Sequence, residues 1–158
     1  MFKKKTREIV VDIEQLRKEI EADEGNVPEI YLDHLKLPTF GIGHLVKKTD
    51  PEHGMPVGTA VSRKRINSCF NDDILGTIED CEKLYKDFYK LPEEVKLILC
   101  NMMYNLGYTR LSKFSKLKKA ITESNWEEAS KQMHQSKWRT QVPNRAERLI
   151  SRMKAVGA

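Results

Sequence analysis

The stretch ADEGNVPEIYLDHLKLPTFGIGHLV, residues 22–46, differs from an ordinary core or surface segment. Glu24 and Asp33 stand nine positions apart, and Thr39 and a Gly-Ile-Gly-His run ending at His44 follow them. From residue 30 onward, apolar residues are mixed with turn-forming Pro and Gly, which predicts a small antiparallel hairpin or a three-strand sheet. The stretch therefore combines a strand signal with two acids, a hydroxyl and a histidine.

Helical patterns lie on both sides of this stretch. Apolar residues recur at helical spacing over residues 9–23, and Gly25 is the expected stop, because glycine takes the left-handed C′ conformation without strain. Residues 47–61 hold two Pro and two Gly and are expected to form a loop. Ser62 can cap the next amphipathic helix. Residues 91–107 leave little polar face, which is typical of a buried central helix.

The predicted fold class is therefore α+β. At 158 residues the chain is expected to form a single domain. We expect an α+β lobe over residues 9–61 and a mainly helical lobe over residues 62–158, and the apolar helix of residues 91–107 is a candidate bridge between them. Residues 1–8 are expected to form a flexible basic arm.

Composition and charge restrict the class of protein. The chain is 39% apolar and 32% charged, which suits a soluble globular protein rather than a disordered one. Its net charge of +5 favours anionic partners: nucleic acid, a membrane surface or an acidic polymer. No apolar run is long enough to predict a membrane span. Acidic residues interrupt the segment after the basic N-terminus, so we expect no signal peptide.

Cysteine and histidine spacing gives no metal signal. The three cysteines are widely spaced and form no C-x-x-C motif, so we expect free thiols, with one disulfide and one free thiol as the alternative. No H-E-x-x-H or similar spacing surrounds the histidines. The run Asp50-x-Glu52-x-Gly54 is too short for a calcium loop. We therefore expect neither a metal nor another cofactor.

The two acids of the opening stretch suggest glycoside hydrolysis. In that reaction one carboxyl gives a proton to the leaving oxygen, and another carboxylate orients or activates a water molecule. The spacing alone is a weak signal, because a chain with 23 acidic residues contains many such pairs. On spacing alone, Glu24 could equally be a solvated helix end and Asp33 a turn residue.

Seven short motifs follow one another through the chain. They are D-E-G at 23–25, I-Y-x-D at 30–33, T-F-G-I-G-H at 39–44, F-N-x-D at 70–73, N-M at 101–102 with a glycine at 107, W-E-E-A at 126–129 and S-K-W-x-x-Q-x-P-N-R-A-x-R at 136–148. Together they resemble the phage-type lysozymes, the T-even phage muramidase family (glycoside hydrolase family 24). The resemblance covers about residues 10–153 and implies a lysozyme-like fold, with two lobes joined by a helix and a cleft between them.

The resemblance implies catalytic roles for three residues. Glu24 corresponds to the general acid, Asp33 to the carboxylate that holds and activates the water, and Thr39 to the hydroxyl that helps to place that water. The family inverts the anomeric configuration, so the two carboxyls are expected roughly 6.5–9.5 Å apart.

Further residues acquire supporting roles from the same resemblance. Arg145 corresponds to the basic partner of the acid, with a helix-cap neighbour as the alternative. His44 corresponds to a histidine that pairs with an acid on the following helix, here Asp73, in a structural role.

Four residues correspond to saccharide contacts in the cleft: Leu45, Tyr104, Leu117 and Gln132. Core packing is the alternative for Tyr104. Leu117 departs from the family pattern, which has a small polar residue there.

The implied function is that of a muramidase, which hydrolyses the β-1,4 bond between N-acetylmuramic acid and N-acetylglucosamine in bacterial peptidoglycan. A lytic transglycosylase and a non-enzymatic binder of peptidoglycan or nucleic acid are the alternatives, although the chain has no recognised nucleic-acid motif. We expect a monomer that serves cell-wall lysis or antibacterial defence. If a phage encodes it, the enzyme would wait in the host cytoplasm until lysis and then act on the wall.

Overall fold

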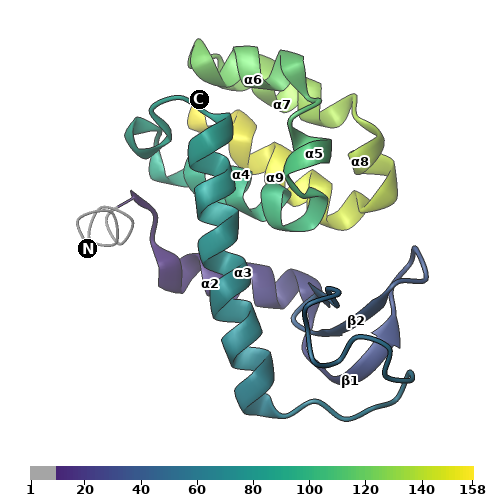
Figure 1. The fold of residues 1–158 in the computed structure, drawn as a ribbon. Helices are drawn as coiled ribbons and strands as arrows, with labels where there is room; N and C mark the ends of the chain where they lie inside the picture. Colours follow the sequence, from purple (N-terminus) through teal and green to yellow (C-terminus); the bar gives the residue numbers. More distant parts are fainter. Residues whose placement is uncertain (1–9) are drawn as a thin grey trace. The chain divides into compact units, whose positions relative to one another are not determined.

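The computed structural model describes residues 10–158 and confirms the α+β fold class (Figure 1). The predicted arm of residues 1–8 lies outside the described residues. The N-terminal elements are helix α2 (Ile13–Glu24) and strands β1 (Val27–Leu32), β2 (Pro38–Gly41) and β3 (His44–Leu45). The helices that follow are α3 (Arg63–Leu84), the 3-10 helix η1 (Phe88–Lys90), α4 (Glu93–Leu106), α5 (Tyr108–Leu111), α6 (Ser115–Thr122), α7 (Trp126–His134), α8 (Lys137–Gln141) and α9 (Pro143–Val156).

Helix α2 begins later than its apolar pattern predicted. The carboxylate of Asp12 accepts a hydrogen bond of 3.1 Å from the backbone N–H of Gln15, which caps the helix at this point. At the other end, Gly25 has a φ of 76° and its N–H donates to the carbonyl of Glu21 at 2.9 Å. The predicted stop at Gly25 is therefore confirmed, and Glu24 is the last residue of the helix.

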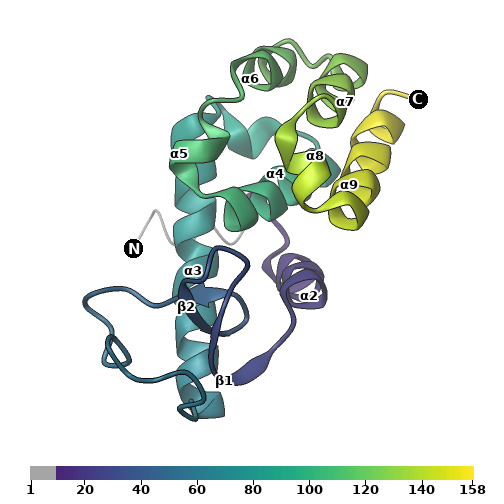
Figure 2. The same ribbon diagram turned by 90° about the vertical axis from the view of Figure 1, so that its right-hand side faces the viewer.

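The three strands form one antiparallel sheet in the order β1-β2-β3. In the first pair, Tyr31 lies opposite Thr39. The loop over residues 47–61 returns to the free edge of β1, where the N–H of Ile30 donates to the carbonyl of Thr59 at 2.9 Å. Figure 2 shows this loop leaving the sheet before it enters α3. The three-strand sheet, rather than a single hairpin, is the form that the sequence adopts.

The chain divides into two compact units. We call residues 17–76 the sheet unit, and residues 10–16 with 77–158 the helical unit. The limits of the units fall within α2 and α3, so these two helices continue from one unit into the other. The expectation that the apolar helix bridges the lobes was wrong, because α4 lies wholly in the helical unit, where its side chains are buried on nearly all sides. The lobe limits at residues 61 and 62 and the cleft stay predictions.

Each unit buries its own apolar side chains. In the sheet unit the fully buried ones include Ile30 and Phe40 of the sheet and Phe70 and Ile74 of α3. In the helical unit α4 is enclosed, and α7 packs beside α9 (Figure 2). The three cysteines, Cys69, Cys81 and Cys100, are buried free thiols. Within residues 10–158, every helix is too short or too polar to span a membrane.

Candidate active site

The carboxyl group of Glu24 lies against the backbone of Gly43. A Cβ atom at position 43 would lie 2.6 Å from Oε1 of Glu24 and 3.0 Å from its Cδ, far inside normal contact distance. Gly43 also has a φ of 66° in the turn between β2 and β3. The second glycine of the G-I-G-H run therefore allows the turn to approach the end of α2.

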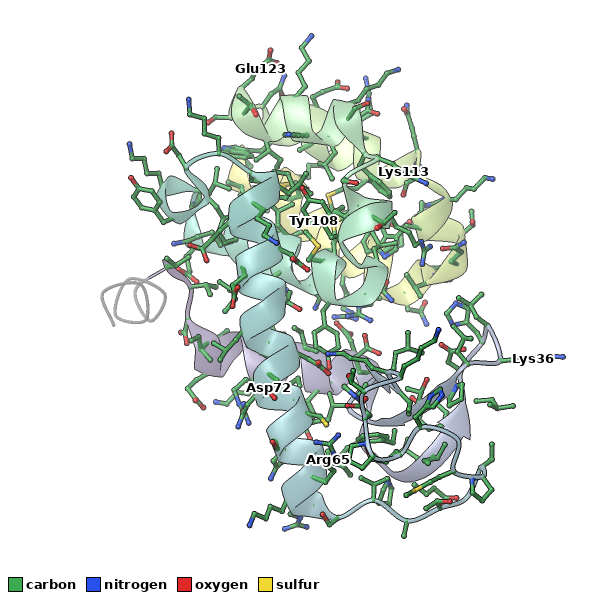
Figure 3. All side chains as sticks on the ribbon, in the orientation of Figure 1. Lys36, Arg65, Asp72, Tyr108, Lys113 and Glu123 are labelled. Atoms are coloured by element: carbon green, nitrogen blue, oxygen red, sulfur yellow. The ribbon has the colours of Figure 1, made fainter. Side chains whose placement is uncertain are left out.

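Asp33 follows β1 and organises the turn that leads into β2. Its Oδ1 atom accepts the backbone N–H groups of Leu35 at 2.8 Å and Leu37 at 2.9 Å. The tip of the turn is Lys36, which has a φ of 62° and projects outward in Figure 3. The two N–H donors hold one oxygen of the Asp33 carboxyl in a fixed direction.

Thr39 sits in β2, next to this turn. Its side chain is only 4% exposed, and its hydroxyl donates to the carbonyl of Leu37 at 3.0 Å. Because the hydroxyl proton is committed to that carbonyl, the oxygen is available as an acceptor. Such an oxygen can hold a water molecule by one of the water's protons.

Tyr31 is a neighbour of both acids to which the sequence analysis assigned no role. It is half-buried on β1, opposite Thr39. Burial raises the pKa of the Tyr31 hydroxyl, and the negative charges of Glu24 and Asp33 raise it further. The charges of both predicted catalytic carboxyls therefore act on one phenol. The tyrosine of the I-Y-x-D motif was the available signal.

His44 is held between two carboxylates. Its Nδ1 lies 2.7 Å from Oδ2 of Asp73, the predicted partner, and its Nε2 lies 2.8 Å from Oδ2 of Asp50. Burial of the ring lowers the pKa of His44, but the hydrogen bonds and charges of the two aspartates outweigh burial and raise the pKa above its ordinary value. The sequence analysis did not identify Asp50 as the partner of Nε2.

Arg65 extends this network along the first turns of α3 (Figure 3). Its guanidinium donates to Glu52 at 3.0 and 3.1 Å and to Asp50 at 3.1 Å. The guanidinium lowers the pKa of the Glu52 carboxyl. These acids had been considered only as parts of a calcium loop, and in the structure they tie the loop to α3.

The helical unit contains the predicted partner of the acid. Arg145 of α9 is 8% exposed, and its Nε donates to Oδ1 of the fully buried Asn101 at 2.7 Å. The N-M and P-N-R-A motifs therefore meet at a buried hydrogen bond. The pairing of Arg145 with Glu24 stays a prediction.

The predicted saccharide contacts are divided between the units. Leu45 of β3 is 48% exposed. Gln132 and Leu117 line a groove of about 710 Å³ in the helical unit, where Leu117 is 1% exposed and offers almost no surface to a ligand. Gln132 donates to the carboxylate of Glu128 at 2.6 Å. Tyr104 of α4 is half-buried.

No group of three or more His, Cys, Asp or Glu side chains in residues 10–158 is arranged to hold a metal ion. The acids near the sheet instead contact backbone N–H groups, His44 and Arg65.

Comparison with known proteins places this chain in a family. Residues 21–155 match the phage lysozyme family. "Probable T4-type lysozyme 2" of Dictyostelium discoideum is 30% identical over 158 residues, covering 88% of this chain and 93% of that protein. "Probable T4-type lysozyme 1" of the same organism is 27% identical with the same coverage. "Pre-baseplate central spike protein Gp5" of Enterobacteria phage T4 is 25% identical over 148 residues, covering 82% of this chain and 26% of that protein. The resemblance inferred from the motifs is confirmed: the chain belongs to the phage lysozyme family and is a hydrolase of that family.

Proposed function

We propose that this protein is a muramidase that hydrolyses the β-1,4 bond between N-acetylmuramic acid and N-acetylglucosamine in bacterial peptidoglycan. One observation carries the proposal. Glu24, at the end of α2, and Asp33, at the end of β1, belong to the same compact unit, and their charges act on the same tyrosine. Both acids lie in the region that matches the phage lysozyme family.

Glu24 is the proposed general acid. It donates its proton to the glycosidic oxygen as the bond from that oxygen to the anomeric carbon breaks. Gly43 has no side chain, which leaves room for this carboxyl group beside the turn. A carboxyl in a defined place can direct its proton at the leaving oxygen.

Asp33 is the proposed base. A water molecule attacks the anomeric carbon from the face opposite the leaving oxygen and gives one proton to Asp33, which inverts the configuration. The N–H groups of Leu35 and Leu37 orient the carboxylate. The oxygen of Thr39 accepts a hydrogen bond from the water's second proton, which stays on the new hydroxyl group of the sugar, because the hydroxyl of Thr39 itself donates to a backbone carbonyl.

The proposed biological role is cell-wall lysis or antibacterial defence, carried out by a monomer. In a phage, the enzyme would stay in the host cytoplasm until lysis. The rival functions are a lytic transglycosylase, which needs no attacking water, and a peptidoglycan binder without catalysis. The orienting contacts of Asp33 and Thr39 favour a reaction that uses water.

The test is the Glu24→Gln variant, assayed by turbidity loss and release of reducing ends from purified bacterial walls. We expect the variant to keep the wild-type melting temperature and to lose activity by roughly two to four orders of magnitude. Glu21→Gln, an exposed acid one turn earlier on α2, is the matched control and should keep wild-type activity. Retention of more than about a tenth of the wild-type rate by Glu24→Gln would rule out the role of general acid.

A further inference from the structure

Exposed apolar side chains are concentrated in one part of the sheet unit. Within residues 10–158 nine large apolar side chains are exposed, and six of them lie between positions 32 and 57: Leu32, Leu35, Leu37, Leu45, Met55 and Val57. Leu45 lies opposite Thr39, so it shares the sheet face of the predicted water site and belongs to the saccharide contacts. The other five have no part in the proposed reaction. Such a concentration of exposed apolar surface marks an interaction site.

The first of these side chains, Leu32, lies on the other face of the sheet. Leu32 pairs with Pro38, and the N–H of Val46 donates to the carbonyl of Pro38 at 3.0 Å, so the three residues lie side by side across the strands. Successive residues of a strand point to opposite faces. Leu32 and Pro38, both exposed, therefore point away from the face that carries Tyr31 and Thr39.

Two turns extend this apolar row. The turn after β1 carries the exposed Leu35 and Leu37. The turn of residues 56–59 lies against the free edge of β1, where the N–H of Gly58 donates to the carbonyl of Ile30 at 2.8 Å. It carries the exposed Val57. We call these side chains the apolar end of the sheet: Leu32, Leu35, Leu37, Pro38 and Val57.

Three lysines accompany the apolar end. Lys36 is at the tip of the turn after β1 and projects outward in Figure 3. Lys47 and Lys48 directly follow Val46 and are exposed. Within residues 10–158, none of the three takes part in an ion pair. Their ammonium groups are therefore available to an anionic partner.

The acids near the apolar end neutralise little of this charge. Asp33 accepts two backbone N–H groups, and Asp50 and Glu52 are bound by Arg65. Glu29 of β1 is exposed, and its carboxylate lies beside the turn of residues 56–59. Three lysines against this one exposed carboxylate leave an excess of positive charge.

Aliphatic side chains combined with lysines suit a lipid surface better than a protein surface. The cores of protein interfaces are enriched in aromatic residues and Arg and are depleted in Lys. At a bilayer surface, aliphatic side chains enter the boundary between headgroups and acyl chains, and lysines keep their ammonium groups at the lipid phosphates. The apolar end holds neither an aromatic residue nor an arginine.

We propose that the apolar end docks on a bilayer that contains anionic lipids, with its aliphatic side chains in the headgroup region and Lys36, Lys47 and Lys48 on the phosphates. This goes beyond the proposed muramidase activity, because docking needs neither Glu24 nor Asp33. It would hold the protein at a membrane surface and leave the face that carries Thr39 uncovered.

The test is co-sedimentation with vesicles made of equal parts phosphatidylglycerol and phosphatidylcholine, and with vesicles of phosphatidylcholine alone. We expect the wild type to bind the anionic vesicles. Leu32→Gln/Val57→Gln should weaken binding roughly tenfold, because less apolar surface enters the bilayer. The matched control Leu75→Gln/Tyr89→Gln replaces two exposed apolar side chains elsewhere and should bind as the wild type does.

A second pair of variants tests the lysines. Lys36→Gln/Lys47→Gln should weaken binding to the anionic vesicles by at least about tenfold at low salt. Lys83→Gln/Lys86→Gln removes the same charge from exposed positions of the helical unit and should leave binding unchanged. Inorganic phosphate at constant ionic strength should not release the protein, whereas complete release would reassign the lysines to a free anion.

Melting temperatures establish that each double variant is folded. Failure of the wild type to bind anionic vesicles, or equal weakening by variants and controls, overturns the proposal. Equal binding to phosphatidylcholine alone overturns the part played by the lysines. A wild-type dimer that Leu32→Gln/Val57→Gln converts to a monomer would assign this surface to a second copy of the chain instead. The vesicles carry no glycan, so an absence of muramidase activity would leave these results unaffected.

Discussion

At the scale of single residues, the missing side chain of Gly43 leaves room for the Glu24 carboxyl. Both Gly43 and Gly54 have positive φ values, 66° and 85°, but a Cβ at position 54 would meet no atom within 4 Å. Replacement by alanine should therefore cost about 1–2 kcal/mol of unfolding free energy at either position, because of the left-handed backbone. At position 43 the new methyl group must also displace the Glu24 carboxyl, whereas at position 54 it displaces nothing.

We accordingly expect Gly43→Ala to lose at least about tenfold in activity on bacterial walls, since misplaced catalytic groups lose rate steeply. Gly54→Ala should keep near wild-type activity despite a similar loss of stability. The measurement pairs reducing-end release with thermal unfolding for both variants. Equal activities of the two variants would contradict the proposed contact between the turn and the acid.

Thr39 provides a second test at this scale. Glutamate at position 39 would place a third carboxyl where the attacking water is expected, so it could attack the sugar itself. We expect Thr39→Glu to form a covalent adduct, detected by intact-protein mass spectrometry, or to release the β-anomer. Thr49→Glu, at an exposed position of the loop, should do neither. An unmodified Thr39→Glu variant that still releases the α-anomer would argue against water at this place.

At the scale of elements, the His44 network ties β3 and the loop to α3. The folded-state pKa of His44 is raised above 6.5, so its ion pairs stabilise the fold fully below pH 6.5 and are lost as the pH rises through the raised pKa. The folded-state pKa of Asp50 lies below 3.8, because the N–H of Lys47, His44 and Arg65 outweigh the effect of burial. Its contribution is present above pH 3.8 and is lost as the pH falls through the lowered pKa. The network is therefore strongest between about pH 4 and 6.5.

The Asp73→Asn variant tests this network. We expect it to lower the unfolding free energy by about 1 kcal/mol at pH 5.5 and by less at pH 8, because it removes the carboxylate that favours the protonated ring. Some activity should remain. Asp72→Asn, its exposed neighbour on α3, is the control and should leave the melting temperature unchanged (Figure 3). A deficit of Asp73→Asn that is the same from pH 5 to pH 8 would argue against a charged pair.

Elements with strong local signals could be predicted from sequence. Gly25 ends α2, and Ser62 caps α3 by accepting the N–H of Arg65 at 3.1 Å. Both signals depend on neighbours within four residues. The start of α2 could not be predicted as well, because apolar spacing continues upstream of the cap at Asp12.

At the scale of the whole molecule, the contacts that sequence reasoning missed join distant segments. Arg145 and Asn101 are 44 positions apart, and Arg65 meets Glu52 across 13. Neither contact produces a periodic pattern in the sequence from which it could be predicted. The catalytic candidates were found only because their motifs resemble a family, since spacing alone left the solvated alternatives open.

The distribution of charge over the surface also depends on the tertiary structure. The net charge of +5 favoured an anionic partner without giving its place. Folding brings Lys137 of α8 to the same groove as Arg110, Lys113 and Lys116, which lie close together in the sequence. Only the tertiary structure reveals that concentration of charge.

The most direct test of the central claim is proton NMR of the first reducing ends that the wild-type protein releases from peptidoglycan. A water molecule held by Asp33 and Thr39 on the face opposite the leaving oxygen must give the α-anomer first. We predict that the α signal appears before mutarotation produces the β signal. A β-anomer released first would force Asp33 into the role of nucleophile, and an anhydro product without a reducing end would contradict hydrolysis altogether.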